Sequence, residues 1–182
     1  IKDLMDRVVA QRNDYAREIE AMGWNRLLDA NRLKNDAALS ESKAMVERAK
    51  AIVDKYEKRS EEFLQATRAR MESLNMSETS RKRMRAGFEQ EVSKSRERMD
   101  ENWRLEKQIL RQYESIVLLL AASKTWVVEN EQIAFGADDD LERFNSSIQA
   151  IQDLTHRQEQ LQESRFAEIN QDMESLKNAV QR

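Results

Sequence analysis

The stretch Asn75-Met76-Ser77-Glu78-Thr79-Ser80 marks the point at which the chain turns back on itself. Asparagine adopts the left-handed conformation that closes a helix more readily than most residues, so Asn75 predicts a helix end. Ser77 supplies a side-chain oxygen that can accept hydrogen bonds from the first free N–H groups of a following helix. Two helices joined by so short a connection run antiparallel. These residues therefore predict a helical hairpin.

On the N-terminal side of this connection, apolar residues recur at the period of an α-helix, in steps of mostly three, four or seven. The positions are Leu4, Val8, Tyr15, Ile19, Met22, Ala30, Leu33, Ala37, Ala44, Met45, Ala49, Ile52, Tyr56, Phe63, Met71 and Leu74. Their phase carries through residues 35–43, where small and polar side chains replace large ones. We therefore expect one helix over about residues 1–74, bent near Gly23. The alternative is a break near residues 35–42, with Ser40 capping a new helix.

On the C-terminal side, the helical period continues from Met84 to Leu120 and returns from Leu141 to Val180. Residues 125–135 between them are rich in β-branched and aromatic side chains. Apolar residues alternate on either side of Asn130-Glu131, which favours a small β-hairpin turning at that pair. The alternative is that the second helix simply runs on to residue 135.

The expected architecture is all-α: an elongated antiparallel bundle of three long helices, with a short irregular or hairpin-like connection near residues 125–138. Residues 1–182 form a single elongated domain, in which residues 1–30 extend past the other two helices as a stalk. If the first helix breaks near residues 35–42, the N-terminal part folds back. The alternative architecture is then a four-helix up-down bundle.

The composition agrees with long helices. The chain has 182 residues, of which 36% are charged, with 3 glycines, no proline and no cysteine. An ordinary domain is about a quarter charged and carries roughly 7% glycine and 5% proline. Chains with so few turn-forming residues do not build sandwiches, barrels or glycine-loop nucleotide sites, and the lack of cysteine excludes disulfides and thiolate chemistry. A formal net charge of −3 selects neither nucleic acid nor anionic membrane as a partner.

The residue inventory also argues against an enzyme. His156 is the only histidine, so any nucleophile–histidine arrangement would have to use it. A four-helix di-iron site needs two Glu-x-x-His pairs, and three scattered glycines cannot form a phosphate-binding loop. The acidic residues near 129–142 lack the spacing of a calcium loop, and Asp138-Asp139-Asp140 is explained by the positive end of a helix dipole. We expect no catalytic activity, no cofactor and no metal.

One charge cluster resists a purely structural explanation. The hairpin tip gathers six cations against only Glu72 and Glu78; the cations are Arg68, Arg70, Arg81, Lys82, Arg83 and Arg85. Four of them lie in the first turns of the second helix, where the dipole disfavours positive charge by about 0.3–1 kcal/mol each. The cluster is a candidate contact for an anionic partner, namely an acidic protein, phospholipid headgroups or, less favoured, nucleic acid. The alternative is a solvated charge run offset by nearby glutamates.

A second candidate is apolar. Trp24 lies off the apolar stripe of the first helix, beside Leu27 and Leu28. On an unpaired stalk, these three residues would form a contact for a partner or the seam of a homodimer. A break in the first helix would bury them instead.

Three functions remain open. The first is a non-catalytic structural or interaction protein that acts as a spacer or scaffold and contacts a protein partner through its ends. The second is a helical sensory or ligand-binding domain of a membrane-anchored protein, and the third is a peripheral binder of anionic membrane through the basic tip. The longest apolar run, residues 116–122, is shorter than the roughly 20 residues that span a bilayer.

The chain begins with Ile1 instead of methionine, which predicts either a removed signal or anchor segment or a piece of a longer protein. On this basis a bacterial cell envelope, in particular the periplasm, is the favoured location, with the cytoplasm as the alternative. No motif is specific enough to indicate a known family.

Overall fold

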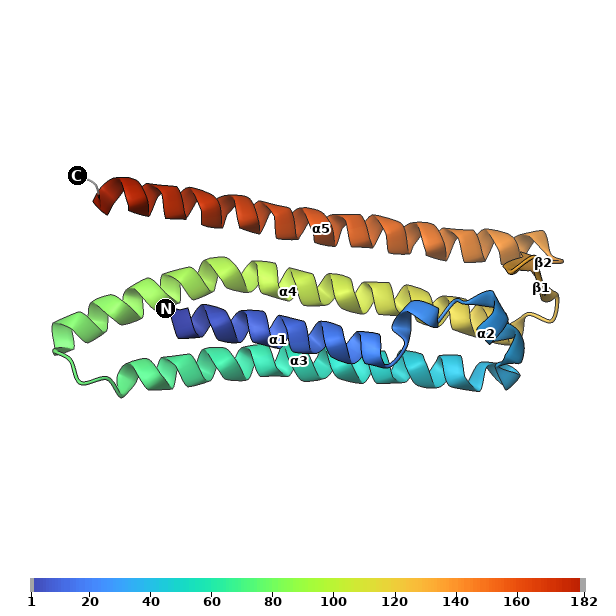
Figure 1. Ribbon diagram of the computed structural model, residues 1–182, viewed down its shortest axis with the longest axis horizontal. Coiled ribbons are helices and arrows are strands. Elements are labelled where there is room, and N and C mark those ends of the chain that lie inside the picture. Colours follow the sequence, from blue (N-terminus) through green and yellow to red (C-terminus); the bar gives the residue numbers. More distant parts are fainter. Residues whose placement is uncertain (1, 181–182) are drawn as a thin grey trace.

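The computed structural model describes the backbone of residues 2–180 and the side chains of residues 9–90, 92–93 and 96–164. Four long helices lie along a rod (Figure 1). They are α1 (Lys2–Ala21), α3 (Ser40–Glu72), α4 (Glu78–Ala122) and α5 (Asp138–Val180). The predicted all-α class is confirmed, with one small two-stranded sheet at the end of the rod opposite the 73–77 connection.

The expectation of a single helix over residues 1–74 is wrong. The helix ends at Ala21, and residues 22–39 form a break segment. This segment contains the short helices η1 (Trp24–Arg26), α2 (Ala30–Asn35) and η2 (Ala37–Leu39). Gly23 takes the left-handed conformation, with φ at 78°, which glycine adopts without steric cost. The break is thus longer than the alternative over residues 35–42, although α3 does begin at Ser40.

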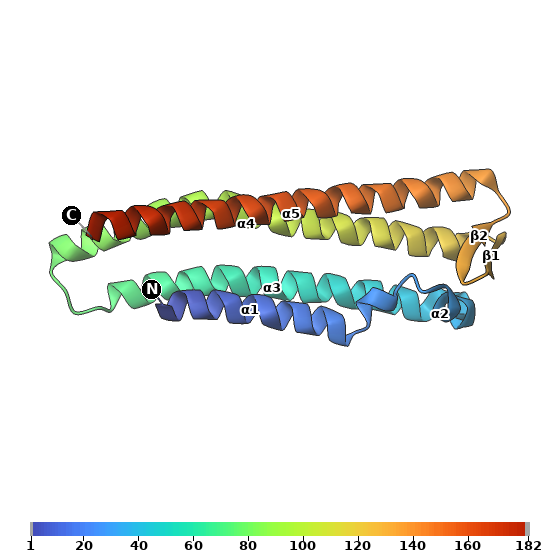
Figure 2. The ribbon, with the colours of Figure 1, turned by 45° about the horizontal axis from the view of Figure 1, so that its top comes forward.

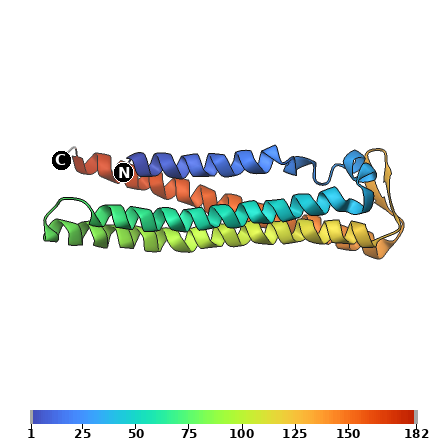
Figure 3. The ribbon, with the colours of Figure 1, turned by 90° about the horizontal axis from the view of Figure 1, so that it is seen from below.

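Because of the break, α1 folds back along α3 and does not project as a stalk. The side-chain amide of Gln11 donates to the Tyr56 carbonyl oxygen at 3.2 Å and to Ser60 Oγ at 2.8 Å. The Lys55 ammonium donates to Glu18 at 2.6 Å. Figure 2 shows α1 and α3 on one side of the rod and α4 and α5 on the other, and Figure 3 shows the rod from below. The expected three-helix bundle is therefore replaced by an arrangement of four long helices.

The connection between α3 and α4 lies where the sequence predicts it. Ser77 Oγ accepts from the backbone N–H of Ser80 at 3.2 Å and so caps α4, as expected. The prediction for Asn75 is wrong: α3 ends at Glu72 with Ser73 as its C-cap, and Asn75 has no left-handed φ. The N–H of Ser73 is shared among carbonyls of the last turn, which closes the helix without a left-handed residue.

The predicted β-hairpin is confirmed between α4 and α5. Strand β1 (Trp126–Glu129) pairs antiparallel with β2 (Gln132–Phe135). The two turn residues, Asn130 and Glu131, both have positive φ, which is the geometry of a two-residue hairpin turn. The Trp126 indole N–H donates to the Leu120 carbonyl oxygen at 2.7 Å and ties the hairpin to the end of α4. The hairpin closes with an N–H···O bond of 3.0 Å from Gly136 to Thr125, an approach so close that a Cβ there would lie 3.3 Å from the Thr125 oxygen.

Most of the buried apolar side chains lie near the hairpin and the break segment. The main core contains Leu27, Leu33, Leu39, Met45, Val46, Ile109, Ile116, Val117, Leu120 and Ile151. A smaller cluster of Ala49, Val53 and Leu110 follows toward the middle of the rod. From residue 57 to residue 90, by contrast, every side chain is at least partly exposed. The rod therefore has a well-packed hairpin end, with the β-hairpin and the break segment, and a sparsely packed tip end around residues 68–85.

Candidate functional site

The six predicted cations gather at the tip end, on the last turns of α3 and the first turns of α4. Figure 1 shows these turns meeting at the 73–77 connection, so the six residues lie around one end of the rod. Ser77 starts α4 immediately after the connection, which brings Arg81, Lys82, Arg83 and Arg85 close to the tip. The structure thus brings the six predicted residues together. Three of them have hydrogen-bond partners within the protein, and the other three have none among the described residues.

The first group is engaged by contacts between α3, α4 and the connection. The Arg68 guanidinium donates to both Glu89 oxygens, at 2.7 and 2.9 Å, and these hydrogen bonds hold the pKa of Glu89 below its ordinary value. Arg85 Nε donates to Glu72 at 2.8 Å. Arg81 donates to the Leu74 carbonyl oxygen at 3.1 Å. Each of these cations joins α4 to α3 or to the connection, so its charge already has a partner inside the molecule.

The second group consists of Arg70, Lys82 and Arg83. All three side chains are exposed. Among the residues that the structure describes, none of the three forms a hydrogen bond or an ion pair with another side chain. Their charges therefore remain available to a partner. The predicted site of six cations is thus reduced to these three.

Two apolar residues at the tip were not part of the predicted site. Leu74 is 40% exposed, which places it among the large apolar side chains of the described residues that face solvent. Met76 lies two residues on, in the same connection, and is partly exposed. The sequence signal for Leu74 pointed to the core because the residue continues the apolar stripe of the preceding helix. That helix ends at Glu72, so Leu74 leaves the stripe.

The predicted apolar contact is a core position instead of a partner surface. Leu27 is 1% exposed and belongs to the main core, and Leu28 packs partly against it. Trp24 packs edge-on against Tyr113, with 5.0 Å between ring centroids. The break segment buries Leu27 fully and Trp24 and Leu28 partly, as expected for the alternative in which the first helix breaks.

A buried polar cluster that the sequence did not indicate lies in the break segment. The Asp36 side chain is only 1% exposed, and that of Arg32 is 8% exposed. Asp36 accepts from Ser42 Oγ at 2.6 Å and from the backbone N–H groups of Ser42 and Glu41 at 2.8 and 2.9 Å. These N–H groups belong to the first turn of α3, so Asp36 caps α3, in place of the predicted Ser40.

The charge of Asp36 is balanced within the same cluster. Arg32 Nη1 lies 3.3 Å from Asp36, and Arg32 Nη2 donates to Ser42 Oγ at 2.7 Å. Burial raises the pKa of Asp36, but the hydrogen bonds from Ser42 and Glu41 together with Arg32 outweigh it, so the pKa lies below its ordinary value. The carboxylate is therefore ionised and fully hydrogen-bonded, which is the state of a structural group.

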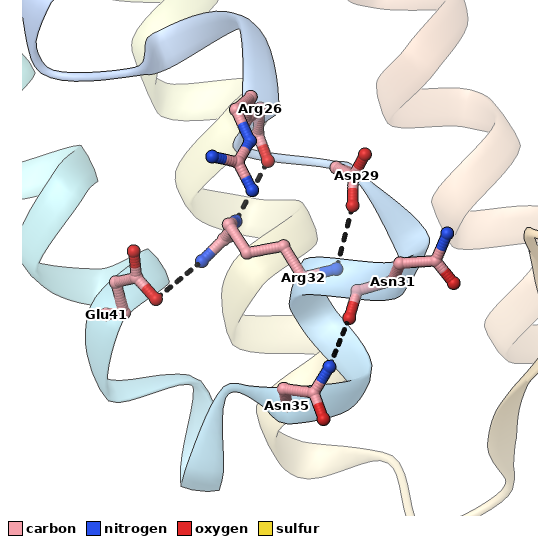
Figure 4. Close-up of a pocket in the computed structure, with 6 residues that line it drawn as sticks. All are labelled: Arg26, Asp29, Asn31, Arg32, Asn35 and Glu41. Carbon is pink, nitrogen blue, oxygen red and sulfur yellow. Dashed lines mark hydrogen bonds and ion pairs between the residues drawn. The ribbon is translucent and has the colours of Figure 1, made fainter.

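Figure 4 shows the open hollow, of about 370 Å³, beside this cluster. Its lining residues are Arg26, Asp29, Asn31, Arg32, Asn35 and Glu41. Arg32 spans the hollow, with its Nε donating to the Arg26 carbonyl oxygen at 2.9 Å and its Nη1 3.5 Å from Glu41. Asp29 caps α2 by accepting from the Arg32 N–H at 2.7 Å. The hydrogen bonds and ion pairs drawn as dashed lines in Figure 4 join these polar groups to one another and hold the break segment in place. The polar lining of the hollow therefore has a structural role.

A further polar contact links three helices in the middle of the rod. The Tyr15 hydroxyl donates to Glu106, whose other oxygen accepts from Gln158 Nε2 at 2.7 Å. Burial, followed by the negative charge of Glu106, raises the pKa of Tyr15. The phenol thus stays protonated and serves as a donor that joins α1, α4 and α5.

His156 lies on α5 with its side chain exposed. Its Nε2 is 2.9 Å from Gln160 Nε2, and its Nδ1 is 3.8 Å from Glu159. Within the described residues, no three histidine or carboxylate side chains converge so as to hold a metal ion. Asp138, Asp139 and Asp140 open α5, the position that the helix dipole favours for acidic side chains.

In the part of the chain that the structure describes, no helix has both the length and the apolar character needed to cross a bilayer. Comparisons with protein-family models, with curated proteins and with solved structures give no match.

Proposed function

We propose that the protein is a non-catalytic helical interaction protein that presents a basic tip at one end of a rod and binds an anionic partner with it. The observation that carries the proposal is the group of three exposed cations, Arg70, Lys82 and Arg83, which have no partner among the described residues. In this function the rest of the molecule is a scaffold: the core at the hairpin end stabilises the rod, and the rod holds the tip away from the core.

The position of the cations supports a role in binding. Lys82 and Arg83 lie in the first turns of α4, where the helix dipole disfavours positive charge. Their neighbours Arg81 and Arg85 offset this cost by joining α4 to the connection and to α3. Lys82 and Arg83 make no such contact, so the fold gains nothing from their charge. A local field of positive sign, on a molecule whose formal net charge is −3, attracts anions to the tip.

Chromatography on immobilised heparin, used as a general polyanion, tests the proposal. The variant R70Q/K82Q/R83Q removes the three free charges. R48Q/K124Q/R143Q is a matched control, because it removes two arginines and one lysine that are also exposed and without a described partner, but that lie toward the hairpin end. We expect the wild type and the control to be retained at low salt and to elute at similar salt concentrations, and the tip variant to elute much earlier.

Two results would contradict the proposal. One is that the wild-type protein passes through the column at low salt. The other is that the tip variant and the control variant elute together, because the retention would then depend on overall charge and not on the tip.

The sensory or ligand-binding alternative has one observation in its favour: α1 begins and α5 ends in the same half of the rod (Figure 1). In this alternative the ligand would bind at the other end, and the hollow beside Arg32 is the candidate position. The arginine there is already engaged by Asp36, Glu41 and backbone oxygens. The basic tip, where Arg70, Lys82 and Arg83 are not engaged, is therefore the better-supported site.

A further inference from the structure

We infer that the anionic partner of the tip is the surface of a membrane containing anionic phospholipids, with Leu74 entering the interface and Arg70, Lys82 and Arg83 contacting the headgroups. This inference rests on the proposed function, because it names the partner of the same site. It depends on the apolar residues of the connection, on the distance of the cations from them, and on the shape of the tip.

The connection ends the rod with apolar and uncharged side chains. Residues 73–77 are Ser-Leu-Asn-Met-Ser and include no charged residue. Leu74 is 40% exposed and Met76 is partly exposed. Exposed apolar side chains at the end of a hairpin lose contact with water when they enter the boundary between headgroups and acyl chains. An aqueous polyanion offers no such gain.

The free cations are set back from this end by a short and similar distance on both helices. Arg70 lies two residues before the end of α3 at Glu72, which is about 3 Å of helix, and Lys82 lies four residues after the start of α4 at Glu78, which is about 6 Å. An interfacial segment enters a bilayer by about 5–10 Å. When Leu74 reaches the acyl boundary, the three cations are therefore at the depth of the phosphate groups, where each Lys or Arg adds to binding.

The shape of the tip favours a membrane over an acidic protein. A stable protein–protein interface buries about 800 Å² on each partner and is built around a well-packed centre of anchor residues. The tip is the narrow end of a helical hairpin (Figure 1), and the free cations come from both of its helices, Arg70 from α3 and Lys82 and Arg83 from α4. A lipid surface can contact both sides at once without a complementary shape, whereas a protein partner needs one.

Co-sedimentation with vesicles tests this inference on the full chain. Vesicles of phosphatidylcholine alone are compared with vesicles in which roughly a third of the lipid is phosphatidylserine. We expect the wild type to bind only the anionic vesicles, at low salt. Three lost headgroup contacts in R70Q/K82Q/R83Q should lower the partition coefficient on the order of 100-fold, while R48Q/K124Q/R143Q should lower it far less.

The insertion of Leu74 into the membrane is tested by a second variant with a matched control. Leu74→Ser removes the inserting side chain, and Leu141→Ser is the control because Leu141 is 41% exposed but lies in the first turn of α5 at the hairpin end. We expect Leu74→Ser to weaken vesicle binding on the order of 5-fold, with its elution from heparin unchanged. Leu141→Ser should leave both measurements unchanged.

The two proposals fail in different ways. If the wild-type protein is retained on heparin in a tip-dependent manner but does not bind anionic vesicles, the membrane inference is wrong and the proposed function stands with an acidic protein as partner. If Leu74→Ser binds vesicles as well as the wild type does, insertion is wrong, and the inference with it. If the protein binds neither heparin nor vesicles, both proposals are wrong.

Discussion

The two ends of the rod contain the same kinds of residues in opposite environments. At the hairpin end, Leu33 is 1% exposed and Arg32 is held by Asp36 and Ser42. At the tip end, Leu74 is 40% exposed and Arg70 is exposed without a described partner. Residue type alone therefore does not separate a structural position from a binding position. Burial and hydrogen-bond partners separate the two kinds of position. They predict that matched substitutions at the two ends will change the free energy of unfolding by unequal amounts.

The largest effect is expected from the buried leucines of the break segment. Leu33→Ala removes a side chain from the main core and leaves a cavity, which should lower the free energy of unfolding by about 3–4 kcal/mol. Leu74→Ala should lower it by less than about 0.5 kcal/mol, because the side chain is partly in water already. Urea unfolding followed by circular dichroism measures both. Equal losses would contradict the difference in packing between the two ends.

The next effect comes from the buried cluster of the break segment. Asp36→Ala leaves the first turn of α3 without its cap and leaves Arg32 buried without its carboxylate, so we expect a loss of about 3 kcal/mol. Glu72→Ala breaks the ion pair with Arg85 at the exposed tip, and here we expect no change beyond the error of the measurement. Urea unfolding of the two variants compares one buried and one exposed carboxylate. An Asp36→Ala protein as stable as the wild type would show that the cluster does not hold the break.

The pH dependence of stability tests the same carboxylate in another way. The pKa of Asp36 in the folded protein lies below its ordinary value of 3.8, so the unfolded state takes up the proton first as the pH falls. The stability that the ionised Asp36 contributes is therefore fully present above about pH 4, and it is lost as the pH falls through the folded pKa. Unfolding measured at several pH values should show a flatter decline for Asp36→Asn than for the wild type. Parallel curves would exclude Asp36 as a source of acid sensitivity.

The break itself shows how far the sequence could predict the fold. Local signals predicted the helical class, the cap at Ser77 and the turn at Asn130-Glu131, because each depends on residues close together in the chain. The break segment was missed over much of its length because Ala37, Ala38 and Leu39 are ordinary helix formers and keep the apolar phase. Its conformation is decided by tertiary burial of Leu27, Leu33 and Leu39 and by a carboxylate that caps a helix beginning four residues later.

The candidate site could be predicted only in part for a related reason. The six cations are visible in the sequence, but which of them are free is not. Arg81 reaches the Leu74 carbonyl seven residues away, and Arg85 reaches Glu72 on the facing helix. These contacts depend on where α3 ends and on how the 73–77 connection joins α3 to α4. The exposed state of Leu74 depends on the same geometry, since the residue lies just beyond the end of α3.

A smaller effect of opposite sign is expected at the break. Ala38 and Leu39 have φ of 53° and 51°, in the left-handed region that side chains with a Cβ disfavour. Ala38→Gly removes this strain and should stabilise the protein by about 0.5–1 kcal/mol, although glycine is more flexible in the unfolded chain. Ala69→Gly, in an exposed helical position near the tip, should destabilise it by about 1 kcal/mol. Thermal unfolding of both variants measures the two changes in stability. Equal decreases in stability would contradict backbone strain at Ala38.

The smallest expected effect is the one that separates binding from folding. R70Q/K82Q/R83Q removes no described intramolecular contact, so its free energy of unfolding should differ from that of the wild type by less than about 0.5 kcal/mol. A slight gain is expected, because the loss of two positive charges at the positive end of the α4 dipole outweighs the loss of Arg70 at the negative end of the α3 dipole. Urea unfolding at low and at high salt measures this, and the gain should disappear at high salt since screening removes the unfavourable interaction. A loss of more than 1 kcal/mol would show that these cations stabilise the fold, and the tip would then resemble the hairpin end in using its charged residues for structure.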